Sequence, residues 1–322
     1  MLIVCLYVDD LIFTGNCEVM LKAFKKSMMD EFEMSDLGKM HYFLGIEVVQ
    51  STNGIFICQQ KYVREILDKF QMRNCNPVNT PNEFGLKLNK DPGGTKVDST
   101  LYKQIVGSLM YLTATRPDIM YSVSLISRYT EKPTHMHLSA AKRILRYLQG
   151  TKDFGLLYQT GQKPHLYGFT DSDYAGDEDD RRSTSGYAFM LGNGAVSWSS
   201  KKQPIVTLSS TEAEFVAATA CACQAIWIRR ILEELKFKQE GATTIFCDNI
   251  STIKLSKNHV LHGRSKHIDV KYHFLRDLVT NEIIDLEYCP CEDQVADILT
   301  KPLRVPTFVK MRKLLGVCSL SK

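Results

Sequence analysis

The sequence predicts an α/β protein of the α+β kind, in which helices pack against mixed sheets, and three observations carry this prediction. The chain has 322 residues, of which 44% are hydrophobic and 24% are charged, as in globular proteins of about two domains. Short β-rich runs alternate with longer stretches of helical periodicity. No apolar run approaches the roughly 18 residues of a membrane span. We therefore expect a folded intracellular protein of the cytoplasm or nucleus, with no membrane partner and no secretion.

Cysteine and charge content narrow the class of protein. The 10 cysteines include no CxxC pair, which argues against a structural zinc knuckle and favours reduced thiols. The 40 Lys and Arg residues nearly balance the 36 Asp and Glu residues, so the net charge is only +4. A nucleic-acid-binding surface must therefore be local. Acids crowd residues 171–180, whereas Lys, Arg and His crowd residues 254–276.

The first half is predicted to contain two hairpins followed by helices. Leu2–Val8 and Leu11–Thr14 are β-rich runs interrupted at Asp9-Asp10, which is a hairpin pattern. Residues 74–96, rich in Pro, Asn and Gly, predict a linker. In order, we expect a hairpin over 2–14, a helix to about residue 33, a hairpin over 42–59, a helix over 61–70, the linker, and helices over 101–115 and 137–149.

From about His165 the pattern becomes that of a sheet with helices packed on it. Gly192-Asn193-Gly194 is a strong hairpin signal, and Thr211-x-x-Glu214 is the pattern of a capping box. In order, we expect strands over 165–170, 186–191 and 195–199, a helix over 211–235, a strand over 243–247, helices over 250–256 and 267–280, a strand over 283–288 and a helix over 293–300. This order predicts a mixed five-stranded sheet with flanking helices.

Three acidic residues fall where these elements begin or end. Asp171 closes one strand and Asp248 another, so both can lie at one edge of neighbouring strands. Glu214 faces a stripe of small residues, whereas Glu212 falls roughly 160° away on the same helix. Carboxylates that point inward repel one another unless a cation is present, and oxygen ligands suit Mg²⁺ or Mn²⁺. Taken singly, each acid also has a structural interpretation as a turn residue, an N-cap or half of a capping box.

The residues around these acids resemble a known family. The segments Phe169-Thr170-Asp171, Glu214-Phe215-x-Ala217, Cys247-Asp248-Asn249 and 295–301 (VADILTK) resemble the four carboxylate motifs of ribonuclease H in copia-type LTR retrotransposon Pol polyproteins. Residues 183–187, 198–203 and 266–269 are also similar to that family. The resemblance covers nearly the whole chain, with the motifs in the family's order.

Upstream segments resemble the polymerase part of the same polyproteins. Tyr7-Val8-Asp9-Asp10 matches the palm motif of reverse transcriptase, 42–48 is similar to the segment that grips the primer, and 107–118 resembles the region joining polymerase to nuclease. The resemblance implies the end of the palm and the following subdomain at 1–73, a linker and helical connecting region at 74–160, a ribonuclease H-like domain at 161–302 and a tail at 303–322. A family polymerase needs a third carboxylate and the fingers from further upstream. We therefore expect Asp9 and Asp10 to be a motif remnant, without polymerisation by this chain alone.

The activity that the resemblance implies is hydrolysis of the RNA strand of an RNA/DNA hybrid. Asp171, Glu214, Asp248 and Asp297 would hold two Mg²⁺ ions roughly 4 Å apart, for which Mn²⁺ can substitute. The hybrid would be recognised by its minor-groove shape and its 2′-hydroxyl groups. The missing N-terminal part of Pol is a further candidate partner.

Additional residues are candidates for supporting roles. Asp173, two residues after Asp171, is an auxiliary candidate, and so is His267, which can handle a proton or simply start a helix. Because the chain is otherwise close to neutral, phosphate attraction is expected at its basic cluster. The expected nucleic-acid-binding residues are Lys254, Lys257, Arg264, Lys266, Lys271 and Arg276, with Lys201 and Lys202.

Two alternatives from other functional classes remain open. The chain could be a catalytically inactive remnant of a mobile element that only binds nucleic acid. It could also be an integrase- or transposase-type nuclease, which uses the same carboxylate chemistry on a related sheet. The Tyr-Val-Asp-Asp hairpin and the lack of an upstream His/Cys zinc set in the sequence argue against the second alternative.

Overall fold

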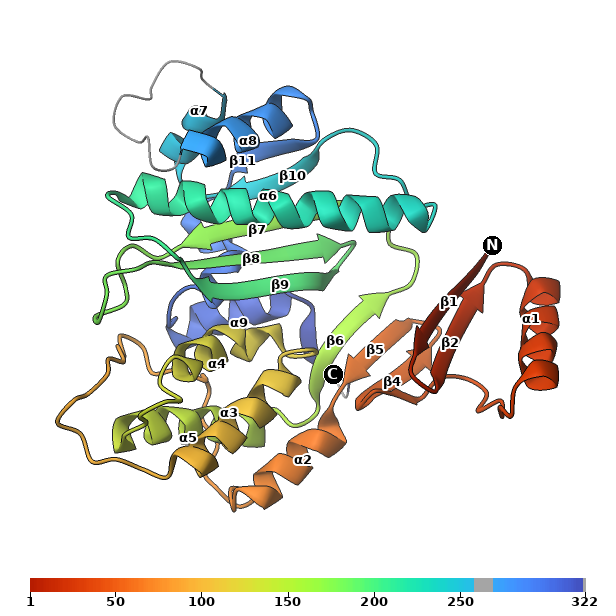
Figure 1. The fold of residues 1–322 in the computed structure, drawn as a ribbon, viewed down its shortest axis with the longest axis horizontal. Helices are drawn as coiled ribbons and strands as arrows, with labels where there is room; N and C mark the ends of the chain where they lie inside the picture. Colours follow the sequence, from red (N-terminus) through yellow and green to blue (C-terminus); the bar gives the residue numbers. More distant parts are fainter. Residues whose placement is uncertain (258–268, 321–322) are drawn as a thin grey trace. The chain divides into compact units, whose positions relative to one another are not determined.

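The computed structural model describes residues 1–257 and 269–320, which form two compact units, Met1–Val48 and Val49–Lys322 (Figure 1). The predicted mixed α/β class is confirmed, because strands and helices alternate along the chain and the helices flank sheets. The predicted domain boundaries at residues 73, 160 and 302 stay predictions.

The first unit is built on a β-hairpin and one helix. Strands β1 (Leu2–Tyr7) and β2 (Asp10–Gly15) pair antiparallel and precede α1 (Glu18–Glu31) and β3 (Tyr42–Phe43). Tyr7 pairs with Asp10, so the two turn residues are Val8 and Asp9, and the predicted turn at Asp9-Asp10 is wrong by one residue. Val8 has a φ of 52°, a conformation that is strained for a β-branched residue. Strand β4 (Ile46–Ser51) starts in this unit and continues into the next.

The second unit contains the predicted mixed five-stranded sheet. Its strand order is β11 (Ile284–Tyr288), β10 (Thr243–Cys247), β7 (Leu166–Ser172), β8 (Thr184–Leu191) and β9 (Gly194–Lys202). Strands β11, β10 and β7 are parallel neighbours, whereas β7, β8 and β9 are antiparallel. The turn between β8 and β9 consists of Gly192 and Asn193, which confirms that hairpin. A second sheet has the neighbouring order β12 (Val317–Ser319), β6 (Phe154–Gln159), β5 (Gly54–Cys58) and β4.

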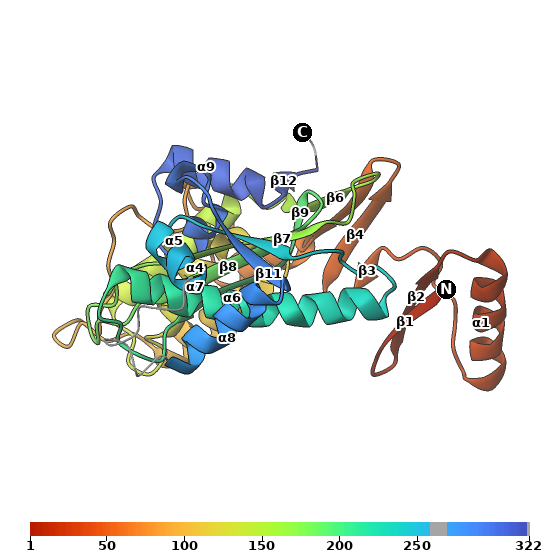
Figure 2. The same cartoon turned by 90° about the horizontal axis from the view of Figure 1, so that it is seen from above.

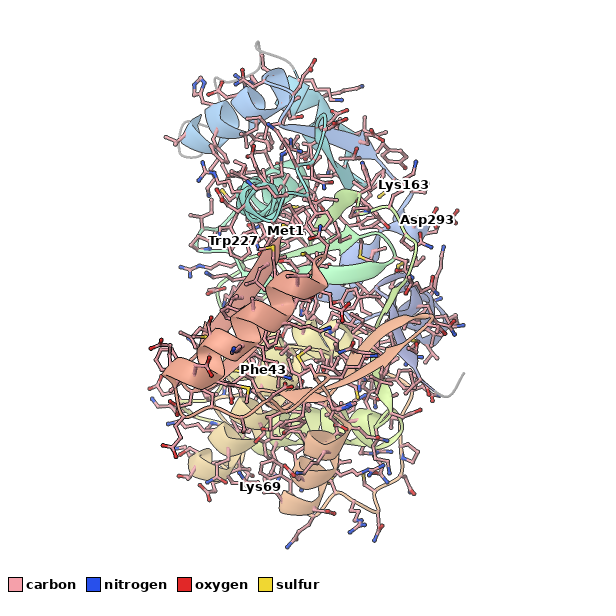
Figure 3. All side chains as sticks on the ribbon, turned by 90° about the vertical axis from the view of Figure 1, so that its right-hand side faces the viewer. Met1, Phe43, Lys69, Lys163, Trp227 and Asp293 are labelled. Carbon is pink, nitrogen blue, oxygen red and sulfur yellow. The ribbon has the colours of Figure 1, made fainter. Side chains whose placement is uncertain are left out.

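Helices cover both faces of the five-stranded sheet. Figure 2 shows α6 (Ser210–Glu234) and α8 (Asp269–Thr280) on one face and α9 (Val305–Leu314) on the other. By length and composition α6 could cross a membrane, but 56% of its most apolar window is buried inside the protein. Trp227, labelled in Figure 3, lies on the outer side of this helix and is 58% exposed. We therefore interpret α6 as the core helix of a globular unit.

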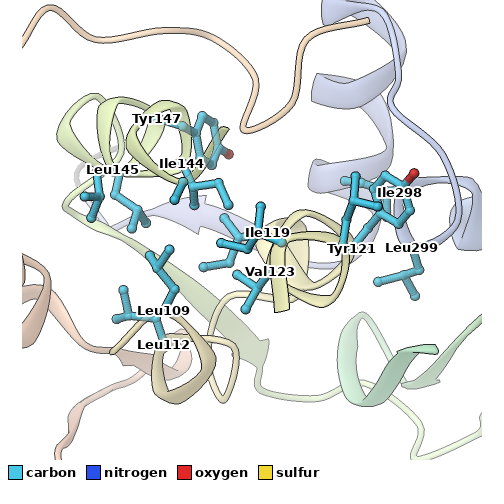
Figure 4. Packing of buried hydrophobic residues seen from close by; sticks show 14 of the residues in the cluster. Leu109, Leu112, Ile119, Tyr121, Val123, Ile144, Leu145, Tyr147, Ile298 and Leu299 are labelled. Atoms are coloured by element: carbon cyan, nitrogen blue, oxygen red, sulfur yellow. The ribbon is translucent and has the colours of Figure 1, made fainter. Parts of the chain in front are cut away.

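Alternate residues of β8 belong to two different hydrophobic cores. Phe189 packs with α6 and α8, whereas Ala188 and Met190 pack with the helices of the connecting region. The helices of this region are α3 (Ser99–Leu112), α4 (Met120–Ser127) and α5 (His135–Gln149), and α2 (Gln60–Lys69), which precedes the region, joins the same core. Figure 4 shows side chains of α3, α4 and α5 gathered in this core, with Tyr121 of α4 beside Ile298 and Leu299. The core that contains Ala188 and Met190 therefore supports the segment that carries the last predicted acid, Asp297.

Several elements differ from the prediction. The sequence analysis missed α4, β6, α9 and β12. Five of the eight residues of α4 are buried, and its partly exposed side carries only Met120, Ser124 and Ser127, so no charged residue marks an outer face. The predicted helix over 293–300 is instead two 3₁₀ turns, η3 (Cys291–Asp293) and η4 (Val295–Leu299). Thr300 ends the second turn, and its backbone N–H donates to the carbonyl of Asp297 at 3.2 Å.

A buried ion pair holds the connecting helices together. Arg116 donates from Nε to Asp118 Oδ1 at 2.9 Å and from Nη2 to Asp118 Oδ2 at 2.8 Å. The hydroxyl of Tyr147, from α5, donates to the same carboxylate at 2.6 Å, and Arg116 also donates to the carbonyl of Thr151 at 2.9 Å. Burial alone would raise the pKa of Asp118, but Arg116 holds it below its usual value. The Arg116-Pro117-Asp118 segment therefore has a structural role in the connecting region.

Candidate active site

Two parallel strands bring the first two predicted acids together. Phe169 of β7 is level with Phe246 of β10, so Asp171 and Asp248, each two residues later, emerge at the same end of the sheet. Asp171 is buried, whereas Asp248 is partly exposed. The expected meeting of these acids at one sheet edge is therefore present.

The start of α6 differs from the predicted capping box. The hydroxyl of Ser209 accepts from the backbone N–H of Glu212 at 3.2 Å, and the carboxylate of Glu212 accepts from the N–H of Leu208 at 2.8 Å. Glu212 is buried as a cap rather than placed on a polar surface. The capping box of Thr211 and Glu214 is wrong because the N-cap is Ser209, two residues before Thr211. Glu214 is consequently not used in capping.

Glu214 faces the sheet edge instead. It is only 6% exposed, and its Oε1 accepts from the backbone N–H of Ser172 at 3.1 Å. Its other oxygen, Oε2, is buried and has no hydrogen-bond partner among the described residues. A buried carboxylate oxygen without a donor is costly, and a bound cation would satisfy it.

The fourth acid, Asp297, is positioned by a close approach of η4 to the sheet. Gln294, fully buried, donates from its amide to the carbonyl of Thr170 at 3.0 Å and accepts from the N–H of Ala296 at 3.1 Å. Gly186, which pairs with Asp171 across β7 and β8, leaves room for η4. A Cβ atom at Gly186 would lie only 2.7 Å from Thr300 Cγ2. Sequence reasoning missed both Gln294 and Gly186, although a glycine inside a strand is a signal of close packing.

The acids form two overlapping groups that could hold a metal ion. In one group, oxygen atoms of Asp171, Asp248 and Asp297 lie within 4.8 Å of one another. In the other, ligand atoms of Glu214, Cys247 and Asp248 lie within the same distance. The four predicted acids thus come from a strand, a helix, a strand end and a 3₁₀ turn that meet at one place. Carboxylate oxygens of this kind fit a hard divalent cation.

Mutual repulsion and burial shift the protonation of this cluster. Burial, then the neighbouring Asp171 and Asp248, raises the pKa of Glu214 to about 10. Burial and Asp171 raise the pKa of Asp297 to about 7, and the same two causes raise the pKa of Asp248. Each shift reflects the cost of placing another negative charge in this cluster. A bound divalent cation would lower that cost.

Lys301 supplies a positive charge to the same acids, and sequence reasoning did not assign it a role. Its Nζ lies 2.9 Å from Oδ1 of Asp297 and 3.5 Å from Oδ2 of Asp171. Although burial alone would lower the pKa of Lys301, these two carboxylates raise it. Thr300 donates a hydrogen bond to Asp171 Oδ2. The residues following Asp297 therefore contribute a cation and a donor to the site.

Asp173 lies beside the acid cluster rather than in it. Among the described residues, it belongs to neither group of close ligand atoms. Its carboxylate accepts from the N–H of Thr184, and burial raises its pKa to about 6. It lines a cavity of about 290 Å³ together with Tyr174 and Lys301. Its predicted auxiliary role stays a prediction, and the other auxiliary candidate, His267, lies outside the described residues.

The predicted nucleic-acid-binding residues have different environments. Lys201 and Lys254 are exposed, and Lys271 is partly exposed. Lys257 is exposed and pairs with Asp285 at 2.8 Å. Arg264 and Lys266 lie outside the described residues.

Two of the predicted basic contacts are not solvent-facing charges. Arg276 is only 6% exposed, because α8 turns it toward the protein interior. Lys202 pairs with Asp177 and Asp180, each at 2.7 Å, so its charge neutralises the acidic segment after β7. The phosphate contacts predicted for Arg276 and Lys202 stay predictions, and in this structure Arg276 is buried and Lys202 is paired with acids.

The predicted polymerase remnant lies in the first unit. Asp9 occupies the hairpin turn, Asp10 begins β2, and both are exposed.

Comparisons with known proteins identify relatives of the chain. Residues 1–84 match the sequence model of the reverse transcriptase (RNA-dependent DNA polymerase) family. The chain is 40% identical over 311 residues to the retrovirus-related Pol polyprotein from transposon RE1 of Arabidopsis thaliana, which covers 97% of this chain and 21% of that polyprotein. It is 34% identical over 219 residues to a transposon Ty5-1 protein of Saccharomyces cerevisiae, which covers 67% of this chain and 71% of that protein. The chain thus spans about a fifth of the length of the RE1 polyprotein.

A solved structure shares the fold. The foamy viral protease-reverse transcriptase dRH, in complex with double-stranded DNA, aligns with 89% of this chain and 46% of that chain. The TM-score is 0.50 and the sequence identity 14%, so the likeness concerns the fold alone.

Proposed function

The chain belongs to the family of copia-type retrotransposon Pol polyproteins, and from this premise we propose that its five-stranded sheet carries a ribonuclease H that cuts the RNA strand of RNA/DNA hybrids. The observation that carries the proposal is the meeting of Asp171, Glu214, Asp248 and Asp297 at one sheet edge. Burying four carboxylates from separate elements side by side costs folding free energy, which a purely structural role would not offset.

The chemistry of the donor set supports Mg²⁺ as the cofactor, with Mn²⁺ as a substitute. The four acids would hold the ions, and the buried, unpartnered Oε2 of Glu214 is an oxygen that fits this use. Bound Mg²⁺ would supply activation of water and stabilisation of the departing ribose oxygen. The N–H of Ser172 orients Glu214, and Gln294 fixes the turn that presents Asp297.

Recognition of the hybrid is proposed to rest on exposed cations of the same unit. Lys201 at the end of β9 and Lys254 on α7 (Ile250–Lys257) are exposed charges that can contact phosphates. Such contacts position the duplex without reading its sequence. The distinction between RNA and DNA strands would come from the 2′-hydroxyl groups.

The proposal is tested by incubating the purified chain and Mg²⁺ with a hybrid labelled on its RNA strand and, separately, with duplex DNA. We expect cleavage of the RNA strand only, and loss of cleavage in Asp248→Asn with the fold unchanged by circular dichroism. Cleavage by Asp248→Asn at the wild-type rate would contradict the assignment of that residue. Hybrid binding without cleavage would favour the inactive remnant, and cleavage of duplex DNA would favour the integrase-type alternative.

A second activity, RNA-directed DNA synthesis, is proposed for the longer polyprotein. The match of residues 1–84 to the reverse transcriptase family and the paired carboxylates of Asp9 and Asp10 favour it. We expect primer extension when the upstream segment of Pol is added, and none from this chain alone. Incorporation by the isolated chain would contradict the second part of this expectation.

A further inference from the structure

Two thiols lie at one side of the acid cluster. Cys247, the last residue of β10, is fully buried, and its sulfur lies within 4.8 Å of carboxylate oxygens of both Glu214 and Asp248. Cys291, exposed at the start of η3, donates from Sγ to Oδ2 of Asp248 at 3.2 Å. The cluster therefore has a sulfur-bearing side that the carboxylate motifs do not explain.

The two overlapping groups of ligands differ in their chemistry. The group of Asp171, Asp248 and Asp297 offers oxygen only, which suits hard ions such as Mg²⁺ and Ca²⁺. The group of Glu214, Cys247 and Asp248 adds a thiol. Sulfur ligands favour softer ions, and Zn²⁺ accepts a mixture of sulfur and carboxylate oxygen.

We propose that Glu214, Cys247 and Asp248, with Cys291 as a fourth donor, form a binding site for Zn²⁺ or Cd²⁺ beside the oxygen-only group. A tetrahedral ion with bonds of about 2.0–2.3 Å separates its ligands by about 3.5 Å. The ligand atoms of Glu214, Cys247 and Asp248 lie within 4.8 Å of one another, so shifts of about 1 Å bring them into range, and Cys291 Sγ already lies 3.2 Å from Asp248 Oδ2. A further observation that points to an ion is the buried Oε2 of Glu214, which has no partner among the described residues, and Glu214 belongs to the thiol-bearing group rather than to the oxygen-only group. On binding, each coordinating thiol releases its proton to solvent and donates a sulfur lone pair, with no change in oxidation state.

Occupation of this site would compete with the proposed catalytic ions. Glu214 and Asp248 belong to both sets of ligands, so Zn²⁺ bound to them removes two of the four acids from Mg²⁺. Zn²⁺ is therefore expected to inhibit hydrolysis of the hybrid. The inhibition rests on the proposed function, whereas the binding of Zn²⁺ does not.

The binding is tested on the full chain, reduced and free of metal, by titration with Cd²⁺. Thiolate coordination produces an ultraviolet charge-transfer band, which we expect to be lost in large part in Cys247→Ser. Cys221→Ser is the matched control, because Cys221 is also fully buried in this unit but donates to the carbonyl of Phe169, away from Asp248. Zn²⁺ affinity, measured by competition with a chromophoric chelator, should fall at least about tenfold in Cys247→Ser and remain unchanged in Cys221→Ser. Equal bands and equal affinities in the two variants would overturn the proposal.

Two further measurements separate the thiol contribution from damage to the fold. Ca²⁺ affinity should be nearly the same in Cys247→Ser and in the wild type, because the oxygen-only group is retained. Cys291→Ser, at an exposed position, should weaken Zn²⁺ binding while leaving the melting temperature unchanged. A protein that binds Zn²⁺ through Cys247 yet cuts no hybrid would support this site and contradict the proposed nuclease. If Cys247→Ser and Cys291→Ser both bound Zn²⁺ with wild-type affinity, the proposed Zn²⁺ site would be overturned and the nuclease proposal would stand.

Discussion

Lys301 Nζ lies 2.9 Å from Oδ1 of Asp297, four residues earlier in the chain. The same ammonium group is 3.5 Å from Asp171, so one lysine partly neutralises two acids of the candidate metal site. A divalent cation held by Asp171 and Asp297 would use the same carboxylates. The ion pairs of Lys301 and the binding of a metal ion are therefore expected to affect each other.

The first prediction concerns this coupling. Lys301→Met should lower the free energy of unfolding by about 1 kcal/mol in EDTA, because the acids lose their counter-charge. The difference should shrink when Mg²⁺ is added, since a bound ion stabilises the variant more than the wild type. Thermal melts with and without Mg²⁺ measure both effects. Lys310→Met, which removes a pair of 2.8 Å between Lys310 and the exposed Asp293, is the control and should show no Mg²⁺ dependence.

The second prediction concerns pH. Asp297 has its pKa raised from 3.8 to about 7, so it binds its proton more tightly in the folded chain than in the unfolded one. Stability from this group is fully present below about pH 4 and is lost as the pH rises toward 7. In EDTA, the wild type should therefore lose about 1–4 kcal/mol more than Asp297→Asn between pH 4 and pH 8. Urea unfolding at both pH values measures it, and parallel pH profiles would contradict the shifted pKa.

The third prediction concerns the glycine behind the site. Gly186→Ala places a Cβ atom 2.7 Å from Thr300 Cγ2, which forces η4 away from β8. We expect a loss of about 1–3 kcal/mol in stability and weaker binding of Mg²⁺, measured by urea unfolding and calorimetric titration. Gly107→Ala is the control, because a Cβ at that helical position meets no atom within 4 Å and helices favour alanine. Unchanged metal affinity in Gly186→Ala would show that Asp297 does not depend on this close approach.

The fourth prediction concerns the connecting region. Asp118→Asn leaves the buried guanidinium of Arg116 without its counter-charge and should cost about 3–5 kcal/mol. Glu131→Gln removes an exposed pair of 4.0 Å with Lys132 and should change stability by less than about 0.5 kcal/mol. Chemical unfolding of both variants compares the two. A small effect of Asp118→Asn would mean that a bound solvent molecule or Tyr147 compensates for the lost charge.

The fifth prediction concerns binding of the hybrid. Replacing the exposed Lys201 and Lys254 with alanine should flatten the dependence of log affinity on log salt by at most about two units, since each phosphate contact adds about 0.9 on a B-form duplex. Fluorescence anisotropy at several salt concentrations, in the Asp248→Asn background, measures this slope. Lys202→Ala should instead leave the slope unchanged and lower stability, because Lys202 is paired with Asp177 and Asp180. A flattened slope in Lys202→Ala would show that this lysine leaves its acidic partners to meet phosphate.

The elements whose pattern is local could be predicted from the amino-acid sequence alone. Strand alternation and turn residues predicted the hairpin of β8 and β9, and they placed Asp171 and Asp248 at the ends of strands. Helical periodicity predicted α6 and the inward direction of Glu214. The family motifs then selected the acids that the structure brings to one edge. These features follow from residues a few positions apart, whose relative directions the backbone geometry already sets.

Which distant residues meet, and which charges stay exposed, depends on how the elements pack together. The contact of Lys301 with Asp171, the approach of Thr300 to Gly186 and the thiol of Cys247 beside Glu214 all join segments far apart in the chain. The burial of Arg276 and the pairing of Lys202 likewise depend on what packs against them. Periodicity shows which face of an element is apolar, but it carries no information about the neighbour that covers this face. The balance between burial and charge that sets the pKa of Glu214 is therefore a property of the packed sheet edge rather than of its sequence motif.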